Sequence, residues 1–155
     1  MARRVTDNLA VENARIIFRN FSGRESQFNR AGNRNFCVVI DDKDLAADLA
    51  EDGWNVKMTN PNNEEYDSEF YIQCSVNFDN IPPSIWLVTN KNKTKLKEED
   101  MDNLDYADFK NVDLIIRPYN WEVNGKTGVK AYVKTMYITI EEDQFADKYS
   151  EEDPF

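Results

Sequence analysis

The stretch Val112–Ile140, VDLIIRPYNWEVNGKTGVKAYVKTMYITI, decides the fold because it predicts a long two-stranded β-hairpin. Two runs rich in branched and aromatic residues, Val112–Val123 and Thr127–Ile140, lie on either side of Asn124-Gly125. Asn-Gly favours a two-residue type I′ turn, whose twist matches that of the paired strands. We therefore expect a mainly β protein built around this hairpin.

The turn also fixes which residues face one another, because side chains alternate between the two faces of a strand. With Asn124 and Gly125 as the turn, Trp121 faces Gly128, and the pairs Tyr119–Lys130 and Arg117–Tyr132 follow. One face then carries rings and cations without an acid: Arg117, Tyr119, Trp121, Lys130, Tyr132 and Lys134. The other face is expected to lie in the core: Leu114, Ile116, Pro118, Val129, Ala131, Val133 and Thr135.

A sheet face that interleaves rings with cations suits a single-stranded nucleic acid. A base stacked on an aromatic ring contributes roughly 1–3 kcal/mol, and lysine and arginine attract the phosphates. The structural alternative is that the rings form cross-strand ladder pairs and the cations keep the face soluble. The pattern alone leaves both interpretations open.

The first 34 residues add a second candidate surface. Ala14–Phe21 is a predicted strand, and the loop after it is rich in glycine, asparagine and arginine. No lysine precedes Lys43, and the planar guanidinium of arginine stacks on bases and binds phosphate through a fork of donors. A solvated arginine loop is the alternative. The candidate nucleic-acid-binding residues of this part are Arg15, Arg19, Phe21, Arg24, Phe28, Arg30, Arg34 and Phe36.

The rest of the pattern predicts about six strands in all, with one or two helices. The clearest helix spans 42–52: acids at Asp41-Asp42 suit its start, Leu45 and Leu49 form an apolar stripe, and Gly53 suits its end. A strand-rich chain of this size is usually a barrel or a sandwich. Other expected strands are Asn35–Ile40, Trp54–Met58, Glu69–Phe78 and Ile85–Thr89; residues 1–13 are expected to be a loose arm, 90–110 a charged and partly helical segment, and Glu142–Tyr149 a short helix.

The charge is unevenly distributed. A net charge of −10 argues, taken alone, against a nucleic-acid binder. Residues 1–34, however, hold seven arginines and three acids, a net of +4, whereas residues 141–155 hold seven acids and one lysine, a net of −6. The chain is therefore expected to have a basic beginning and an acidic end.

The composition argues against catalysis and against a metal site. The chain has no histidine, so the usual general base and the commonest metal ligand are missing. Five glycines are too few for phosphate-binding glycine loops. Cys37 and Cys74 lie in apolar runs and are expected to be reduced core thiols, with a disulfide left open. No apolar run spans a membrane, so we expect a cytoplasmic protein with no cofactor and no catalytic residue.

The chain ends Glu151-Glu152-Asp153-Pro154-Phe155. Folding does not explain an aromatic ring beside the free carboxylate on an acidic segment. Docking does, because a ring fits an apolar pocket while the acids meet a basic rim. We expect residues 1–149 to form a nucleic-acid-binding domain and 150–155 a partner-binding tail.

This ending resembles the acidic tip of bacterial and phage single-stranded DNA-binding proteins, which finish in acids followed by Pro-Phe. Arg15–Ala31 and Arg117–Tyr137 also look like segments of small phage-encoded proteins of this kind. The resemblance implies an OB-fold body and a tip that binds replication and recombination proteins through Asp153, Pro154 and Phe155, with Glu151 and Glu152 as the acidic lead. One departure is that the predicted helix follows the second strand, whereas the usual OB helix follows the third.

The sequence thus predicts a mainly β, elaborated OB-fold-like barrel with a disordered acidic C-terminal tail. Its expected function is sequence-tolerant coating of single-stranded DNA, in the bacterial host cytoplasm if phage-encoded, with a homo-oligomer left open. One alternative is an acidic DNA mimic that blocks a host nuclease or defence protein, favoured by the acids at 41–52 and 98–108. Another is a nuclease with Mg²⁺ on Asp41, Asp42 and Asp44, although these more simply begin a helix.

Overall fold

The computed structural model describes residues 5–59, 68–79, 81–90 and 92–140. Within them, nine strands belong to one sheet, accompanied by one α-helix and one 3-10 helix. This confirms the predicted mainly β fold. The elements are β1 (Leu9–Val11), β2 (Arg15–Asn20), β3 (Arg34–Ile40), α1 (Lys43–Asp52), β4 (Val56–Met58), β5 (Phe70–Val76), β6 (Ser84–Val88), β7 (Lys93–Leu96), η1 (Glu98–Asp105), β8 (Phe109–Val123) and β9 (Lys126–Ile140).

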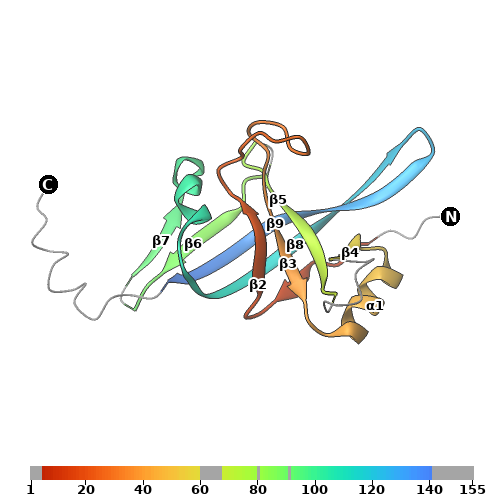
Figure 1. Cartoon of the computed structure of the whole chain (residues 1–155), viewed down its shortest axis with the longest axis horizontal. Coiled ribbons are helices and arrows are strands. Elements are labelled where there is room, and N and C mark those ends of the chain that lie inside the picture. Colours follow the sequence, from red (N-terminus) through yellow and green to blue (C-terminus); the bar gives the residue numbers. More distant parts are fainter. Residues whose placement is uncertain (1–4, 60–67, 80, 91, 141–155) are drawn as a thin grey trace, which may run out of the picture.

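The main path of the sheet runs β1-β8-β9-β5-β3-β2. Its two end strands are consecutive in the chain, and the Ala14 amide between them donates to the Val112 carbonyl at 2.7 Å. The sheet therefore curls round into a partly open barrel (Figure 1). β2, β3 and β5 form an antiparallel meander, and β5 then pairs in parallel with β9. The result is an open mixed sheet, and its antiparallel meander followed by a long hairpin is the strand order of an OB-fold.

The β8–β9 hairpin has the predicted register. Asn124 and Gly125 have φ angles of 52° and 80°, as a type I′ turn requires, and Trp121 lies opposite Gly128. The hairpin projects well beyond the barrel (Figure 1).

A β-bulge interrupts β9. Ile116 pairs with Val133 and Ile115 with Thr135, so Lys134 is an extra residue. After the bulge the alternation of side chains shifts by one residue, so that Met136 and Ile138 face the core and are fully buried. The expectation that Thr135 continues the core face is therefore wrong.

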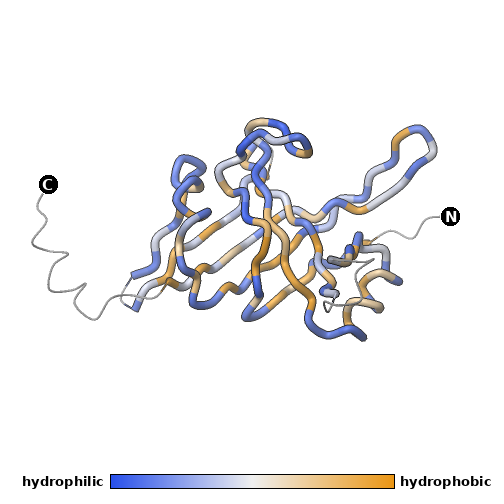
Figure 2. The backbone as a smooth tube through the Cα atoms, viewed as in Figure 1, coloured by the Kyte–Doolittle hydropathy of each residue, from blue (hydrophilic) through white to orange (hydrophobic). Residues whose placement is uncertain are grey.

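One apolar core fills the barrel, and the polar residues concentrate in the loops (Figure 2). Phe21 and Phe36 stack at its centre with ring centroids 5.1 Å apart. Cys37 and Cys74 are free thiols, as expected. Burial raises the pKa of Cys37 to about 11, partly opposed by Lys57, and burial raises that of Cys74 as well.

α1 has the predicted ends. The Asp42 carboxylate accepts hydrogen bonds from the amides of Asp44 (2.9 Å) and Leu45 (3.2 Å), and Gly53 ends the helix at φ 118°. α1 follows β3, the second strand of the meander, and this is the predicted departure from the usual OB-fold. η1 lies between β5, the third strand of the meander, and β8, which is the position of the usual OB helix. The fold is therefore an elaborated barrel that has helices at both positions.

Two short strands escaped the sequence analysis. Leu9–Val11 pairs with β8, so the expectation of a loose arm is wrong there. Lys93–Leu96 pairs with β6 although it lies in a segment expected to be charged and partly helical. The helix expected at Glu142–Tyr149 and the acidic tail lie outside the described residues. Neither helix in the described part of the chain is long and apolar enough to cross a membrane.

Asp105 holds the end of β2 against η1. Its carboxylate, only 2% exposed, accepts hydrogen bonds from the amides of Phe21 (2.6 Å) and Ser22 (3.2 Å) and from the Ser22 hydroxyl (2.6 Å). These two amides lie just past the last residue of β2. Asp105 therefore joins the edge of the barrel to the segment that leads into β8.

We predict that Asp105→Ala lowers the free energy of unfolding by about 2–4 kcal/mol, because two poorly exposed amides lose their acceptor. Urea denaturation measures the loss, with Glu99→Ala, an exposed acid of the same helix, as the matched control. Equal stability of the two variants would contradict this role of Asp105.

Candidate nucleic-acid interface

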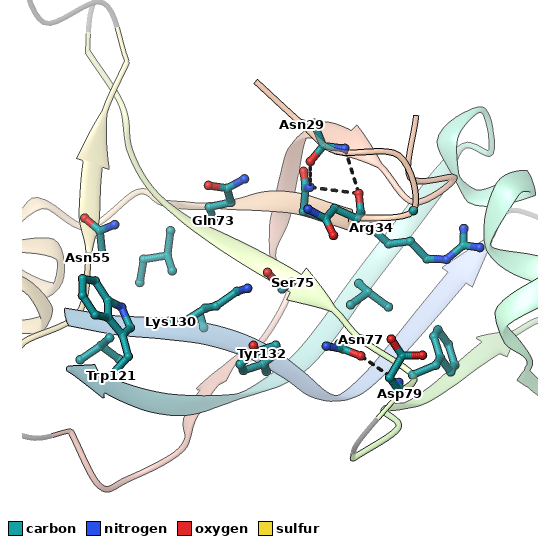
Figure 3. A pocket seen from close by; sticks show the side chains of 18 of the residues that line it. Asn29, Arg34, Asn55, Gln73, Ser75, Asn77, Asp79, Trp121, Lys130 and Tyr132 are labelled. Atoms are coloured by element: carbon teal, nitrogen blue, oxygen red, sulfur yellow. Dashed lines mark hydrogen bonds between the residues drawn. The ribbon is translucent and has the colours of Figure 1, made fainter. Parts of the chain in front are cut away.

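A groove of about 380 Å³ crosses the outer face of β3, β5 and β9. The loop between β2 and β3 borders one end, with Phe28 and Asn29, and the β8–β9 hairpin borders the other, with Trp121 (Figure 3). In OB-folds this same face, with the loops that flank it, binds oligonucleotides. The groove is therefore the candidate interface.

The floor of the groove is built by the alternation of the strands. Asn35 of β3 lies opposite Ser75 of β5, Ser75 opposite Tyr132 of β9, and Tyr132 opposite Arg117 of β8. Paired residues share a face, so these four side chains form a stripe across four strands. The groove also has side-chain amides that offer both donors and acceptors: Asn29, Asn33, Asn35, Asn55, Gln73 and Asn77.

The hairpin brings the predicted rings and cations together. Tyr119 and Tyr132 meet edge to face with centroids 6.0 Å apart. The Arg117 guanidinium and the Lys130 ammonium each lie 5.1 Å from the Tyr132 centroid. Tyr119 stays 51% exposed and Trp121 37% exposed. The rings therefore do form cross-strand ladder pairs, which was the alternative to nucleic-acid binding. These pairs still leave ring surface exposed that a base can reach.

Gly128 makes room for the Trp121 ring. A Cβ atom at this glycine would lie 2.5 Å from Cζ2 of the indole. The indole therefore lies directly across the partner strand, where no side chain separates it from the backbone. This contact orients the Trp121 indole at the hairpin end of the groove.

The arginine-rich loop is organised by asparagine side chains. Asn29 donates to the carbonyls of Arg24 (2.8 Å) and Asn33 (3.0 Å), and Asn35 donates to Asn29 at 2.9 Å. This scaffold presents Phe28, which is 90% exposed. An exposed ring on an ordered loop is available for stacking.

Two of the predicted binding residues lie elsewhere. Phe21 and Phe36 are fully buried and stack on each other in the core. The expectation that their rings contact bases is therefore wrong. Both residues belong to hydrophobic predicted strands, Ala14–Phe21 and Asn35–Ile40, and this pattern already indicated a position in the core.

Four predicted arginines have partners within the protein. Arg15 forms ion pairs with Glu69 and Asp41. The guanidinium of Arg19 lies 3.8 Å from the Phe109 ring centroid and donates to the Leu104 and Ala107 carbonyls; burial lowers its pKa. Arg34 donates to the Phe21 carbonyl at 2.6 Å and pairs with Glu98 and Asp102. Arg15, Arg19 and Arg34 thereby hold the barrel together. Arg24 lies 3.9 Å from the Asp105 carboxylate and donates to the Arg19 carbonyl at 3.3 Å, but its side chain stays 59% exposed. Arg30 and Lys134 are exposed as well.

The sequence analysis missed the floor of the groove. Gln73, Ser75 and Asn77 occupy alternate positions in and just after β5. That alternation was visible in the sequence, but short polar residues on a strand carry no chemical signature of their own. Among the described residues, no group of three cysteine or acidic side chains could hold a metal ion.

A family model described as "Putative phage ssDNA-binding domain" matches residues 1–154. Among solved structures, the single-stranded DNA-binding protein of bacteriophage Enc34 in complex with ssDNA is similar at TM-score 0.56 and 12% identity, over 93% of this chain and 96% of that one. A second structure of the Enc34 single-stranded DNA-binding protein is similar at TM-score 0.54 and 11% identity, over 96% of this chain and 97% of that one. At this identity the likeness concerns the fold. No curated protein sequence matches the chain.

We predict that Gly128→Ala displaces the Trp121 ring and lowers the free energy of unfolding by about 1 kcal/mol, since the new methyl overlaps a ring that can move toward solvent. The indole NMR signal and urea denaturation report the two effects, with Thr127→Ala as the neighbouring control. An unchanged indole signal would show that the ring does not rest on Gly128.

Proposed function

The chain belongs to the phage single-stranded DNA-binding family, and we propose that it holds the DNA strand in the groove across β3, β5 and β9. It is a single-stranded DNA-binding protein and not an enzyme. The observation that carries the groove proposal is the group of rings and cations on the hairpin, around Tyr132, together with the exposed Phe28 at the other end of the groove. This is the nucleic-acid-binding face of an OB-fold.

The chemistry of the groove suits binding that tolerates any base sequence. Rings stack on the π-face that every base has, and cations attract phosphates that every nucleotide carries. A protein of similar fold has been solved in complex with ssDNA, which supports the same use of this face. The proposed contact residues are Arg24, Phe28, Arg30, Gln73, Asn77, Arg117, Tyr119, Trp121, Lys130, Tyr132 and Lys134.

The acids of the described residues argue against a DNA mimic. Asp42 caps α1, Asp105 binds the end of β2, and Glu98 and Asp102 pair with Arg34. Carboxylates used in this way organise the fold rather than imitate a row of phosphates. Both acid clusters, at 41–52 and at 98–108, therefore contain acids with a structural role.

We propose further that the last five residues recruit replication and recombination proteins in the host cell. Residues 141–155 carry a net charge of −6 and include Pro154-Phe155 next to acids, which suits a basic rim around an apolar pocket on a partner. The same negative charge keeps this segment from adding to the affinity for DNA. Strand binding and partner binding are then separable functions.

We predict that Tyr119→Ala and Trp121→Ala each weaken binding to oligo-dT about 5- to 100-fold, because each removes a stacking platform of roughly 1–3 kcal/mol. Fluorescence anisotropy at fixed salt measures the loss. Tyr106→Ala is the matched control, since Tyr106 is 80% exposed at the end of η1, away from the groove. Unchanged affinity in both hairpin variants, with the fold intact, would place the strand elsewhere.

We predict that deleting residues 150–155 leaves the affinity for oligo-dT unchanged or a few-fold tighter, because the deletion removes like charge. The same deletion, and Phe155→Ala alone, should abolish pull-down of host replication proteins. Loss of DNA binding on deletion would instead make the tail part of the fold.

A further inference from the structure

A second cluster of rings and lysines lies on the β6–β7 hairpin. Trp86 of β6 lies opposite Tyr137 of β9 on one side and opposite Lys95 of β7 on the other. The Lys93 ammonium is 4.6 Å from the Trp86 ring and 5.5 Å from the Tyr137 ring. Tyr137 is 36% exposed and both lysines are exposed. We call these four residues the β6–β7 cluster.

The cluster faces outward, as the groove does. Its two rings alternate with Ile85, Met136 and Ile138, which are fully buried, so the rings point away from the core. On β9, Tyr132 likewise alternates with the buried Ala131 and Val133. β9 therefore carries Tyr132 of the groove and Tyr137 of the cluster on the same outer side, with the bulge at Lys134 between them.

The two lysines are available for a ligand. Neither Lys93 nor Lys95 forms an ion pair within residues 5–59, 68–79, 81–90 and 92–140. The nearby carboxylate of Asp113, opposite Tyr137, instead accepts from the Asn13 amide at 2.8 Å and from Asn111 at 3.1 Å. Arg15 and Arg34, in contrast, form ion pairs with acids of this protein, Glu69 and Asp102.

We propose that the β6–β7 cluster is a second binding subsite for the same DNA strand, which leaves the groove at Tyr132 and continues along β9. This rests on the groove proposed above. Tyr132 and Tyr137 are five positions apart on one strand, about 16 Å at the usual rise, so a few nucleotides bridge them. A base stacks on Trp86 or Tyr137 as Lys93 turns from the ring to a phosphate.

Continuity with the groove favours DNA over the other available ligand, the acidic segment that begins at residue 141. That segment would satisfy the lysines and carries three rings of its own, Phe145, Tyr149 and Phe155. The choice of DNA therefore rests on the outer side of β9, which joins Tyr132 of the groove to Tyr137 of the cluster. The site also explains why a sheet extension outside the barrel carries two rings and two lysines on its outer face.

The test compares short and long oligo-dT. An oligomer of about 6 nucleotides fills only the groove, while one of about 20 nucleotides reaches the cluster. Lys93→Gln/Lys95→Gln should bind the short oligomer as the wild type does. It should bind the long one about 25-fold more weakly at 0.1 M salt, with a salt slope lower by about 1.4, since each lysine accounts for about 0.7.

The control is Lys43→Gln/Lys110→Gln, which removes the same charge from α1 and β8. A second measurement uses tryptophan quenching in Trp121→Phe, where the long oligomer should quench more than the short one through Trp86. Equal affinity and equal salt slope of the cluster variant and the control on the long oligomer would overturn the proposal.

Two further outcomes are distinct. Failure of the wild type to bind even the short oligomer would overturn the groove itself. Weaker binding of a peptide of residues 141–155 to the cluster variant, with DNA binding unchanged, would assign the cluster to the tail and overturn the DNA subsite.

Discussion

The pairing register of β8 and β9 is the constraint on which the rest of this structure depends. Because side chains alternate, the one register set by Asn124-Gly125 places Ile116 and Val133 in the core and Arg117 and Tyr132 on the outer face. A slip by one residue would exchange the two sets, burying cations and exposing the core. Since β9 also pairs with β5 and β6, its register positions the groove and the sheet extension together.

Much of this could be predicted from the sequence because the signals are local. The Asn-Gly turn, the cap at Asp42 and the stop at Gly53 each act within a few residues, and each was found where predicted. The bulge at Lys134 was not, since it depends on how β9 meets β5 and then β6. β1 was missed for a similar reason: three residues form a strand only because β8 offers them a partner.

The candidate site was only partly predictable because arginine and phenylalanine serve both folding and binding. Phe21, Phe36 and Phe28 have the same chemistry, yet two fill the core and the third is 90% exposed. Arg34 and Arg24 are alike in sequence context, but the side chain of Arg34 is 15% exposed and paired with two acids, whereas that of Arg24 is 59% exposed. Tertiary contacts with η1, which lies far along the chain, determine which of these residues serve the fold and which stay exposed.

Those contacts also change the meaning of the net charge of −10. The acids of η1 pair with Arg34 of β3 and with Arg24 of the β2–β3 loop, so part of the negative charge and part of the arginine-rich beginning cancel within the fold. Beside the exposed loop arginines Arg24 and Arg30, cations without an acidic partner among the described residues lie along β9 and its neighbours, at Arg117, Lys130, Lys93 and Lys95. A strand of DNA that follows rings and exposed cations is therefore led along β9, from the hairpin toward the sheet extension, and not over Arg15, Arg19 and Arg34, whose partners lie within the protein.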